Sequence, residues 1–453
     1  MESNIEKLMA YVEKNRELLL TTERYIWSHP EIGYKEWGTS AYLEKEFEKL
    51  GYTLTKAGDI PGFIADLDTG RPGPKVAILG ELDSLICATH PEANPETKAM
   101  HACGHHCQTT MVLGCAAAFK EEDALKDMCG SIRFVIVPAE ETIDLEFRSG
   151  LLEKGTIHYV AGKIEFLYRG LFDGVDMAMM VHVENEGDYL FEIIDGSDGC
   201  ITKHFEYQGV AAHAGAAPHD GVNALYAASL GMTACNSIRE TFREKDYVRF
   251  HPIITQAGVA ANAIPNVAKM DAYVRASSVE VMLETNKKIN RALTASAAAV
   301  GANLSIHDTP GNLPYHSDKM LMNLFRESVT ELFGEGVIFD GGWNTGSSDI
   351  GDISSIMPAI QPLCAGASGK GHGEDYEISD PEKAVINPTK VLVMSAYKLL
   401  SNDGKIAKEV IANYKPVYAD KTEYFQAVNS MEINKKTVNY KEDGTIILDF
   451  QNN

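Results

Sequence analysis

The segment 101–106, His-Ala-Cys-Gly-His-His, places a thiol and an imidazole two residues apart, with Gly104 between them. Both side chains, Cys103 and His105, can therefore turn toward one ion. The Ala-, Leu- and Met-rich run 109–120 predicts a helix, whose N-terminal N–H groups would favour a thiolate. A thiolate and a neutral imidazole suit zinc or a similar divalent ion. Taken alone, the segment also fits a cysteine nucleophile with its histidine base, or a His-rich surface turn.

Three short apolar runs end in residues that could bind metal or move protons. Such runs, separated by helical segments, predict a largely parallel sheet that is covered on both faces. Since open α/β sheets bind ligands at the carboxyl ends of their strands, we expect these residues to gather at one sheet edge. The runs are 76–79, followed by Glu81 and Asp83, 132–137, followed by Glu140 and Glu141, and 177–181, followed by His182.

Composition limits the class of protein. The 453 residues are 45% hydrophobic, enough for two domains, and the formal net charge of −23 argues against nucleic acid as a partner. No apolar run is long enough to cross a bilayer, and we expect no secretory signal and no membrane partner. The 8 cysteines have no paired spacing, which predicts reduced thiols and a cytoplasmic location.

A change of pattern near residue 197 predicts a second domain inserted into the first. Strand-like and helical stretches follow in the order β-α-β-β-α-β, which is typical of a small ferredoxin-like domain. The expected boundaries are 1–196 and 311–410 for a discontinuous catalytic domain, 197–310 for an inserted lid and dimerisation domain, and 411–453 for an extension of unassigned role.

Five blocks in this order resemble the M20 metallopeptidases. The resemblance covers roughly residues 15–400 and is strongest to the branch of that family that hydrolyses N-acyl and aminobenzoyl amino acids. Each block is weak alone, and their order and spacing together are specific. The blocks are Gly80-Glu81-Leu82-Asp83, His101 to His106, Pro138-Ala139-Glu140-Glu141, His213-Ala214-Gly215 with Pro218 and Gly221 to Leu225, and the late His372.

The resemblance implies an α/β fold, with a mostly parallel-sheet, zinc-peptidase-like catalytic domain and an inserted ferredoxin-like lid. It implies metal-dependent hydrolysis of an amide bond in an N-acyl or N-aroyl amino acid or a dipeptide-like small molecule with a free carboxylate, such as p-aminobenzoyl-glutamate. Two divalent ions per protomer are expected, Zn²⁺ or Mn²⁺ first, with Co²⁺ and Ni²⁺ left open. The implied metal ligands are Cys103, His105, Glu141, His182 and His372.

Further residues receive roles from the same resemblance. Glu140 is the implied general base, and Asp83 is the implied carboxylate that orients a ligand. His213, from the inserted domain, would polarise the scissile carbonyl, often in the active site of the partner protomer, so a homodimer is expected. Asn262 and Arg275 would hold the substrate carboxylate, which the guanidinium fork of arginine binds bidentately.

The chain departs from the family pattern at three places. Relatives most often carry Asp where His106 stands and His where Gln108 stands. The Gly-rich run that usually follows the two glutamates is replaced by Thr142-Ile143-Asp144-Leu145-Glu146. These departures mean that the family pattern does not predict the shape of the substrate pocket.

Two other functions compete with the metal-dependent hydrolase. A binding protein of the same fold would have lost its base or a ligand, yet all those positions are filled. A cysteine hydrolase using Cys103 and His105 would leave Glu141, His182 and His372 unexplained.

Overall fold

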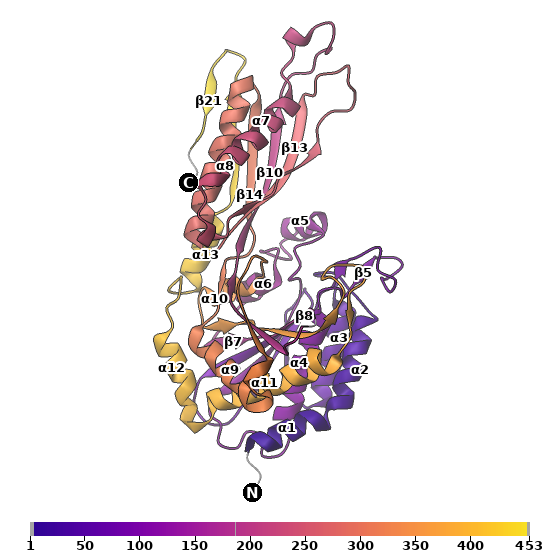
Figure 1. Ribbon diagram of the computed structural model, residues 1–453, viewed down its shortest axis with the longest axis vertical. Coiled ribbons are helices and arrows are strands. Elements are labelled where there is room, and N and C mark those ends of the chain that lie inside the picture. Colours follow the sequence, from indigo (N-terminus) through magenta and orange to yellow (C-terminus); the bar gives the residue numbers. More distant parts are fainter. Residues whose placement is uncertain (1–3, 186, 451–453) are drawn as a thin grey trace. The chain divides into compact units, whose positions relative to one another are not determined.

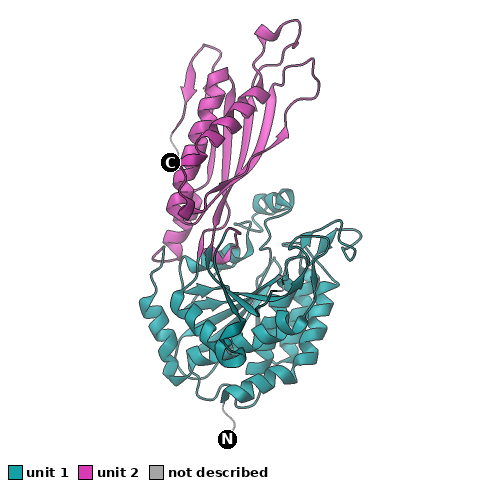
Figure 2. Cartoon of the chain, in the orientation of Figure 1, with its two compact units in different colours: residues 1–196, 316–344, 352–417 teal, residues 197–315, 345–351, 418–453 magenta. Residues whose placement is uncertain are grey.

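The computed structural model describes residues 4–185 and 187–450, and the chain divides into two compact units (Figure 2). Unit 1 comprises residues 1–196, 316–344 and 352–417, and unit 2 comprises residues 197–315, 345–351 and 418–453. These limits differ from the expected boundaries at four places. Residues 311–315 lie in unit 2 although the sequence placed them in the catalytic domain, and residues 411–417 lie in unit 1 although the sequence placed them in the extension. Residues 345–351 and 418–453 belong to unit 2, whereas the sequence placed the former in the catalytic domain and the latter in an unassigned extension.

The main sheet of unit 1 has six strands in the order β1-β2-β6-β3-β7-β17. Strands β6, β3, β7 and β17 are parallel neighbours, as the apolar runs predicted, and β1 and β2 add two antiparallel strands at one side. The strand bounds are β1 Leu54–Lys56, β2 Phe63–Asp68, β3 Lys75–Glu81, β6 Ser131–Val137, β7 Met177–Met179 and β17 Ala359–Ile360.

Helix α4 (His105–Phe119) is buried at every residue and packs on β3. It begins at His105, four residues before the predicted start. Its apolar character on all sides follows from its surroundings, because α1, α2 and α11 pack around it as well (Figure 1). The bounds of these helices are α1 Asn4–Lys14, α2 Arg16–Trp27 and α11 Asn387–Leu400.

A second six-stranded sheet in unit 1 contains His182, one of the predicted metal ligands. In it, β8 (His182–Asn185) runs parallel to β18 (Leu363–Ser368), with His182 opposite Leu363. The chain after β18 forms the loop that contains His372 and returns in β19 (Glu377–Ile378). The pairing of β8 with β18 therefore brings two stretches of chain that are far apart in sequence to one place.

Unit 2 contains β10, α7, β11, β12, β13, α8 and β14 in chain order. Alternate residues of β10 and β13 are buried, and α7 and α8 pack against these strands. The bounds are β10 Gly199–Gln208, α7 Ala224–Ser237, β11 Arg249–Phe250, β12 Ile253–Gln256, β13 Val267–Ala276, α8 Val279–Val300 and β14 Asn303–Pro310.

The C-terminal segment extends the sheet of unit 2. Strand β20 (Ile433–Tyr440) pairs antiparallel with β14, and β21 (Ile446–Leu448) pairs with β20. The segment to which the sequence assigned no role thus supplies two strands. Among the described residues, no helix is long and apolar enough to cross a membrane.

Candidate functional site

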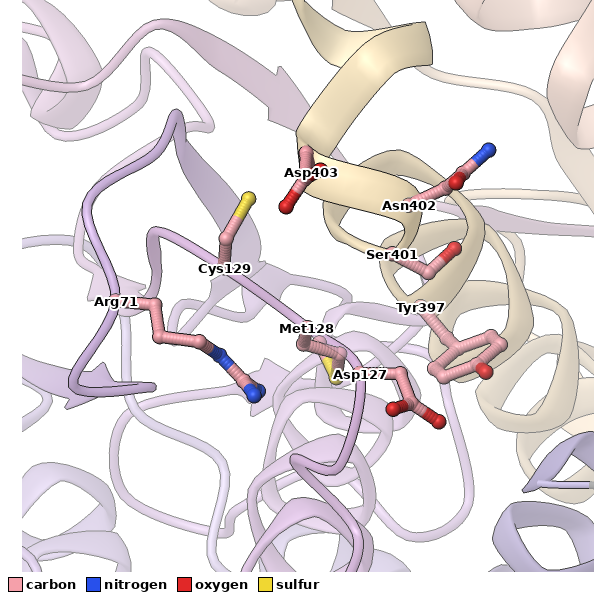
Figure 3. Close-up of a pocket in the computed structure, with 8 residues that line it drawn as sticks. All are labelled: Arg71, Asp127, Met128, Cys129, Tyr397, Ser401, Asn402 and Asp403. Carbon is pink, nitrogen blue, oxygen red and sulfur yellow. The ribbon is translucent and has the colours of Figure 1, made fainter.

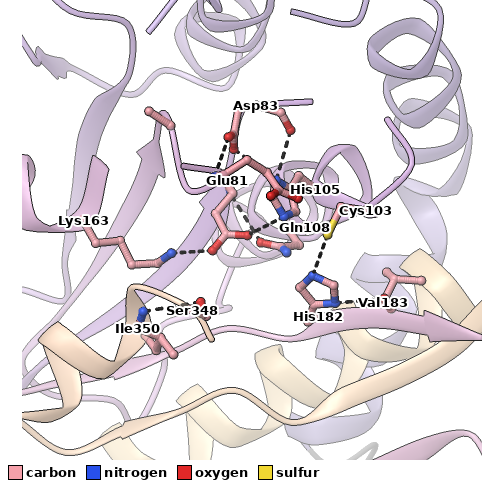
Figure 4. Close-up of polar contacts among 12 residues, drawn as sticks. Glu81, Asp83, Cys103, His105, Gln108, Lys163, His182, Val183, Ser348 and Ile350 are labelled. Carbon is pink, nitrogen blue, oxygen red and sulfur yellow. Dashed lines mark hydrogen bonds and ion pairs between the residues drawn. The ribbon is translucent and has the colours of Figure 1, made fainter. Parts of the chain in front are cut away.

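Cys103 and His105 flank a glycine at the start of α4. Gly104 has a φ of 85°, and a Cβ at this position would lie 2.8 Å from the Tyr376 hydroxyl and 3.0 Å from Cβ of Val183. Only glycine combines this backbone conformation with this close approach. The turn directs Cys103 toward His182, and the Cys103 Sγ lies 3.5 Å from the His182 Nε2 (Figure 4).

Backbone contacts hold His182 and His372, the two predicted ligands that are far from Cys103 in sequence. The His182 Nδ1 lies 2.9 Å from the carbonyl oxygen of Val183, so Nε2 faces Cys103. The backbone N–H of His372 donates to the carbonyl oxygen of Ala102 over 2.8 Å, which ties the late loop to the Cys103 turn. The His372 Nε2 lies 3.0 Å from the Glu141 Oε1.

These side chains form two sets that share Cys103. Cys103, His105 and His182 form one set and Cys103, Glu141 and His372 the other, with the ligand atoms of each set within 4.8 Å of one another. This spacing matches ligands on one ion, because metal–ligand bonds are about 2.0–2.3 Å long. The two sets bring together all five residues that the resemblance implied.

The polar atoms at the centre of these sets fit a cation. Among the described residues, the buried His105 Nε2 and Glu141 Oε1 have no hydrogen-bond partner of good geometry, although Glu81 and His372 lie within ion-pair distance of them. Buried polar atoms without hydrogen bonds are costly, and a metal ion between them would satisfy both. Glu140 lies in a third set with His105 and Glu141, so it is close enough to act on a water bound there.

Asp83 contacts two of the candidate ligands. Its Oδ1 lies 3.1 Å from the His105 Nδ1, and its backbone oxygen lies 3.0 Å from the same nitrogen. Its Oδ2 accepts a hydrogen bond from the backbone N–H of Glu141 over 2.9 Å. A proton held on Nδ1 leaves the His105 Nε2 free to bind metal.

Glu81 and Lys163 form a buried ion pair beside the ligands. The sequence marked Glu81 only as a candidate residue at a strand end and gave Lys163 no role. Both are 0% exposed, and the Glu81 Oε2 lies 3.2 Å from the His105 Nε2. Burial alone would raise the pKa of Glu81, but the charges of Lys163 and His105 lower it to about 2. No pattern in the sequence signals Lys163, which lies in the buried helix α6 (Gly162–Tyr168).

Burial changes the expected chemistry of Cys103. The helix N-terminus predicted a readily ionised thiol, whereas burial raises the pKa of the Cys103 thiol above its ordinary value. The thiol is therefore poorly suited to be a free nucleophile at neutral pH. A divalent ion would supply the positive charge that a thiolate needs here.

The three remaining predicted residues lie in unit 2. The backbone N–H of Ala214 donates to the carbonyl oxygen of Asn262 over 2.9 Å, so the loops of His213 and Asn262 are neighbours. The His213 Nδ1 accepts hydrogen bonds from Gly215 and Ala216, which fix the ring. Arg275, on β13, donates to the carbonyl oxygen of Thr345 over 3.2 Å.

A surface cavity of about 540 Å³ lies elsewhere in unit 1 (Figure 3). It adjoins the amino ends of β3 and β6, whereas the candidate ligands follow the carboxyl ends of the strands. None of the predicted site residues lines it. Its lining consists of Arg71, Asp127, Met128, Cys129, Tyr397, Ser401, Asn402 and Asp403.

Comparison with known families decides the classification. Residues 77–397 match the model of peptidase family M20/M25/M40. The chain belongs to this family. The prediction from the five sequence blocks is confirmed, and the chain is an M20-family peptidase or amidohydrolase.

Relatives span most of the chain. It is similar to the Xaa-Arg dipeptidase of Mus musculus, 28% identical over 414 residues that cover 86% of this chain and 87% of that protein. It is also similar to one chain of the p-aminobenzoyl-glutamate hydrolase of Escherichia coli (strain K12), 31% identical over 272 residues that cover 58% of this chain and 51% of that one. Among solved structures, the YXEP protein of Bacillus subtilis, described as a dinuclear metal binding peptidase, has a TM-score of 0.66 and 20% identity, covering 86% of this chain and 99% of that one.

Proposed function

We propose that this M20-family enzyme uses two divalent metal ions to hydrolyse the amide bond of an N-acyl or N-aroyl amino acid or of a dipeptide-like small molecule. The observation that carries the proposal is the pair of ligand sets that share Cys103 beside Glu140. Cys103 would belong to the residues that hold either ion, and its thiolate would supply negative charge there. The names of the relatives, a dipeptidase and a p-aminobenzoyl-glutamate hydrolase, support a substrate with a free carboxylate.

Three residues have separate parts in the proposed mechanism: Glu140 transfers the proton, Asp83 orients two ligands, and Lys163 balances a buried charge. Bound ions would lower the pKa of a water molecule and polarise the amide carbonyl. Glu140 accepts the proton of the attacking water and then returns it to the leaving amine. Asp83 keeps His105 and Glu141 in orientation through the contacts described above. Lys163 balances the charge of Glu81, the buried carboxylate next to the candidate ligand His105.

Unit 2 is proposed to act as a ferredoxin-like lid and as the dimerisation unit. Arg275 and Asn262 would hold the free carboxylate of the substrate, and His213 would donate a hydrogen bond to the oxyanion that forms at the scissile carbonyl. The ring of His213 is oriented for such a task, since two backbone N–H groups hold its Nδ1. We further propose that His213 acts in the site of the partner protomer.

Metal analysis of the purified protein, combined with a substrate panel, tests this proposal. The panel contains N-acyl and N-aroyl amino acids, p-aminobenzoyl-glutamate and Xaa-Arg dipeptides. We expect two equivalents of divalent metal, cleavage of at least one class, loss of activity with a chelator and recovery when metal returns. Zn²⁺, Mn²⁺, Co²⁺ and Ni²⁺ are each added back to identify the preferred ion.

Two results would contradict the proposal. Full activity of metal-free protein would favour a cysteine hydrolase that uses Cys103. A metal-loaded protein that binds panel compounds and cleaves none of them would favour a binding protein of the same fold.

A further inference from the structure

The backbone immediately before Glu140 is strained. Ala139 is 0% exposed and has a φ of 58°, in the left-handed region that residues with a Cβ rarely occupy. Strain of this kind persists only where the surroundings hold it, and it concentrates at functional sites. The carbonyl oxygen of Ala139 accepts a hydrogen bond from the backbone N–H of Gly162 over 3.1 Å. This turn sets the different directions in which Glu140 and Glu141 leave the chain.

Glu36 holds the amino side of the turn. Its Oε1 accepts a hydrogen bond from the backbone N–H of Ala139 over 2.8 Å, and Glu36 is 0% exposed. Glu36 stands at the N-cap of α3 (Trp37–Lys49), yet its side chain makes no capping hydrogen bond there. Burial and the nearby charge of Asp83 raise the pKa of Glu36 well above its ordinary value.

Arg148 holds the carboxyl side of the same turn. It lies in α5 (Leu145–Glu153), is 1% exposed, and donates one guanidinium nitrogen to the carbonyl oxygen of Glu141. A second nitrogen donates to the carbonyl oxygen of Val160 over 2.6 Å. Gly33 closes the arrangement, because a Cβ there would lie 3.0 Å from the Ala139 Cα and would collide with Arg148.

We propose that Glu36 and Arg148 are positioning residues for the adjacent carboxylates Glu140 and Glu141. Glu36 fixes the backbone before the proposed base, and Arg148 fixes the backbone after the proposed ligand. Without them the left-handed turn relaxes, and the two carboxylates lose the orientation that separates metal binding from proton transfer. This inference rests on the proposed function.

The test compares buried-residue variants with matched controls. Glu36→Ala removes the acceptor, whereas Glu36→Gln keeps an acceptor oxygen for the backbone N–H of Ala139. Arg148→Lys cannot reach both carbonyl oxygens from one nitrogen. Glu46→Ala is the control on the same helix, since Glu46 pairs with Lys49. Arg133→Lys is the control for a buried arginine that donates to backbone carbonyl oxygens of residues 171 and 173.

Three quantities are measured on each full-length variant: affinity for Co²⁺ or Zn²⁺ by competition, kcat and KM, and unfolding by urea. We expect Glu36→Ala and Arg148→Lys to lose roughly 10–100-fold in metal affinity, as for other residues that orient ligands, and to lose kcat more than they raise KM. Glu36→Gln and both controls should stay within about threefold of wild type in metal affinity.

A double variant separates positioning from a general contribution to folding. In Glu36→Ala/Ala139→Gly, glycine occupies the left-handed region without strain, so metal affinity and kcat should recover in part. A Glu36→Ala protein that loses only stability, or a double variant that recovers nothing, would overturn the proposal. Because metal affinity is measured independently of turnover, a wild type that binds no metal refutes the proposed function instead.

Discussion

Cys103 is the residue on which the two ligand sets meet, and its surroundings explain much of the chemistry. Its thiol is partly buried and desolvated, which raises its pKa, and it faces His182 from a turn that only glycine can form. Spacing and residue type marked Cys103 and His105 as candidate metal ligands, and a cysteine nucleophile or a surface turn remained as alternatives until the other blocks were considered. It could not predict Glu36, because the contact that gives this residue a role joins positions 36 and 139, and only the folded chain brings them together.

At the same scale, Asp83→Asn tests the orientation of the ligands. An amide has one acceptor oxygen, so it cannot accept from both His105 and the backbone N–H of Glu141 as the carboxylate does. We expect metal affinity to fall roughly 10–100-fold. Competition titration with a chelator measures this affinity, with Asp66→Asn as the control on β2. Wild-type affinity in Asp83→Asn would show that the ligands are held by other contacts.

Among the elements, the carboxyl ends of β3, β6 and β7 determine where the site forms. The sequence predicted this edge correctly because parallel strands place their ends together, and the residues after each run were of ligand type. It predicted the start of α4 four residues late, since His105 and the polar residues after it gave no helical apolar pattern. Because α4 is buried on all sides, its sequence lacks the polar face that usually marks a helix.

The buried ion pair between Glu81 and Lys163 links β3 to α6, and removing one partner should destabilise the folded protein. Lys163→Met leaves the buried Glu81 without its lysine partner, which is expected to lower the free energy of unfolding by about 3–5 kcal/mol. Urea denaturation measures the change. In the double variant Glu81→Leu/Lys163→Met no unpaired charge remains, so most of the loss should be restored. Equal destabilisation in single and double variants would contradict this account.

The contact between Glu23 on α2 and His106 on α4 predicts that the stability of the protein depends on pH. Burial opposes ionisation of Glu23, but Arg24 and His106 lower its pKa to about 2. A lowered pKa stabilises the folded state above the unfolded value near 4.5, and this contribution is lost as the pH falls from there toward 2. Glu23→Gln should therefore be less stable than wild type by roughly 1–3 kcal/mol at pH 7, with a smaller difference at pH 3. Urea midpoints at both pH values check this, and a constant difference would refute it.

At the scale of the whole molecule, each of the two units is built from segments that are far apart in the sequence. The sequence predicted an inserted domain from a change in pattern near residue 197, which is where unit 2 begins. It could not assign residues 418–453, because β20 has only a weak alternating pattern and is specified by pairing with β14. Long-range strand pairing is a property of the folded sheet, and sequence periodicity alone does not reveal it.

The proposed dimer leads to a complementation experiment. If His213 serves the site of the partner protomer, Glu140→Gln and His213→Ala homodimers are both inactive. Mixed dimers then contain one complete site, so mixing and exchange of protomers should restore about a quarter of wild-type activity. Activity assays before and after exchange, with size-exclusion chromatography, measure this. A fully active monomer, or no recovery despite exchange, would contradict the assignment of His213.

The two adjacent carboxylates are proposed to divide the work: Glu141 binds metal, and Glu140 moves the proton. The most direct test measures metal content and kcat for Glu140→Gln and Glu141→Gln side by side. Glu140→Gln should keep its metal and its stability while kcat falls at least 10²–10⁴-fold, roughly the value for loss of a general base. Glu141→Gln should lose metal. Loss of metal from Glu140→Gln with retention in Glu141→Gln would reverse the roles, and an active Glu140→Gln enzyme would contradict the mechanism.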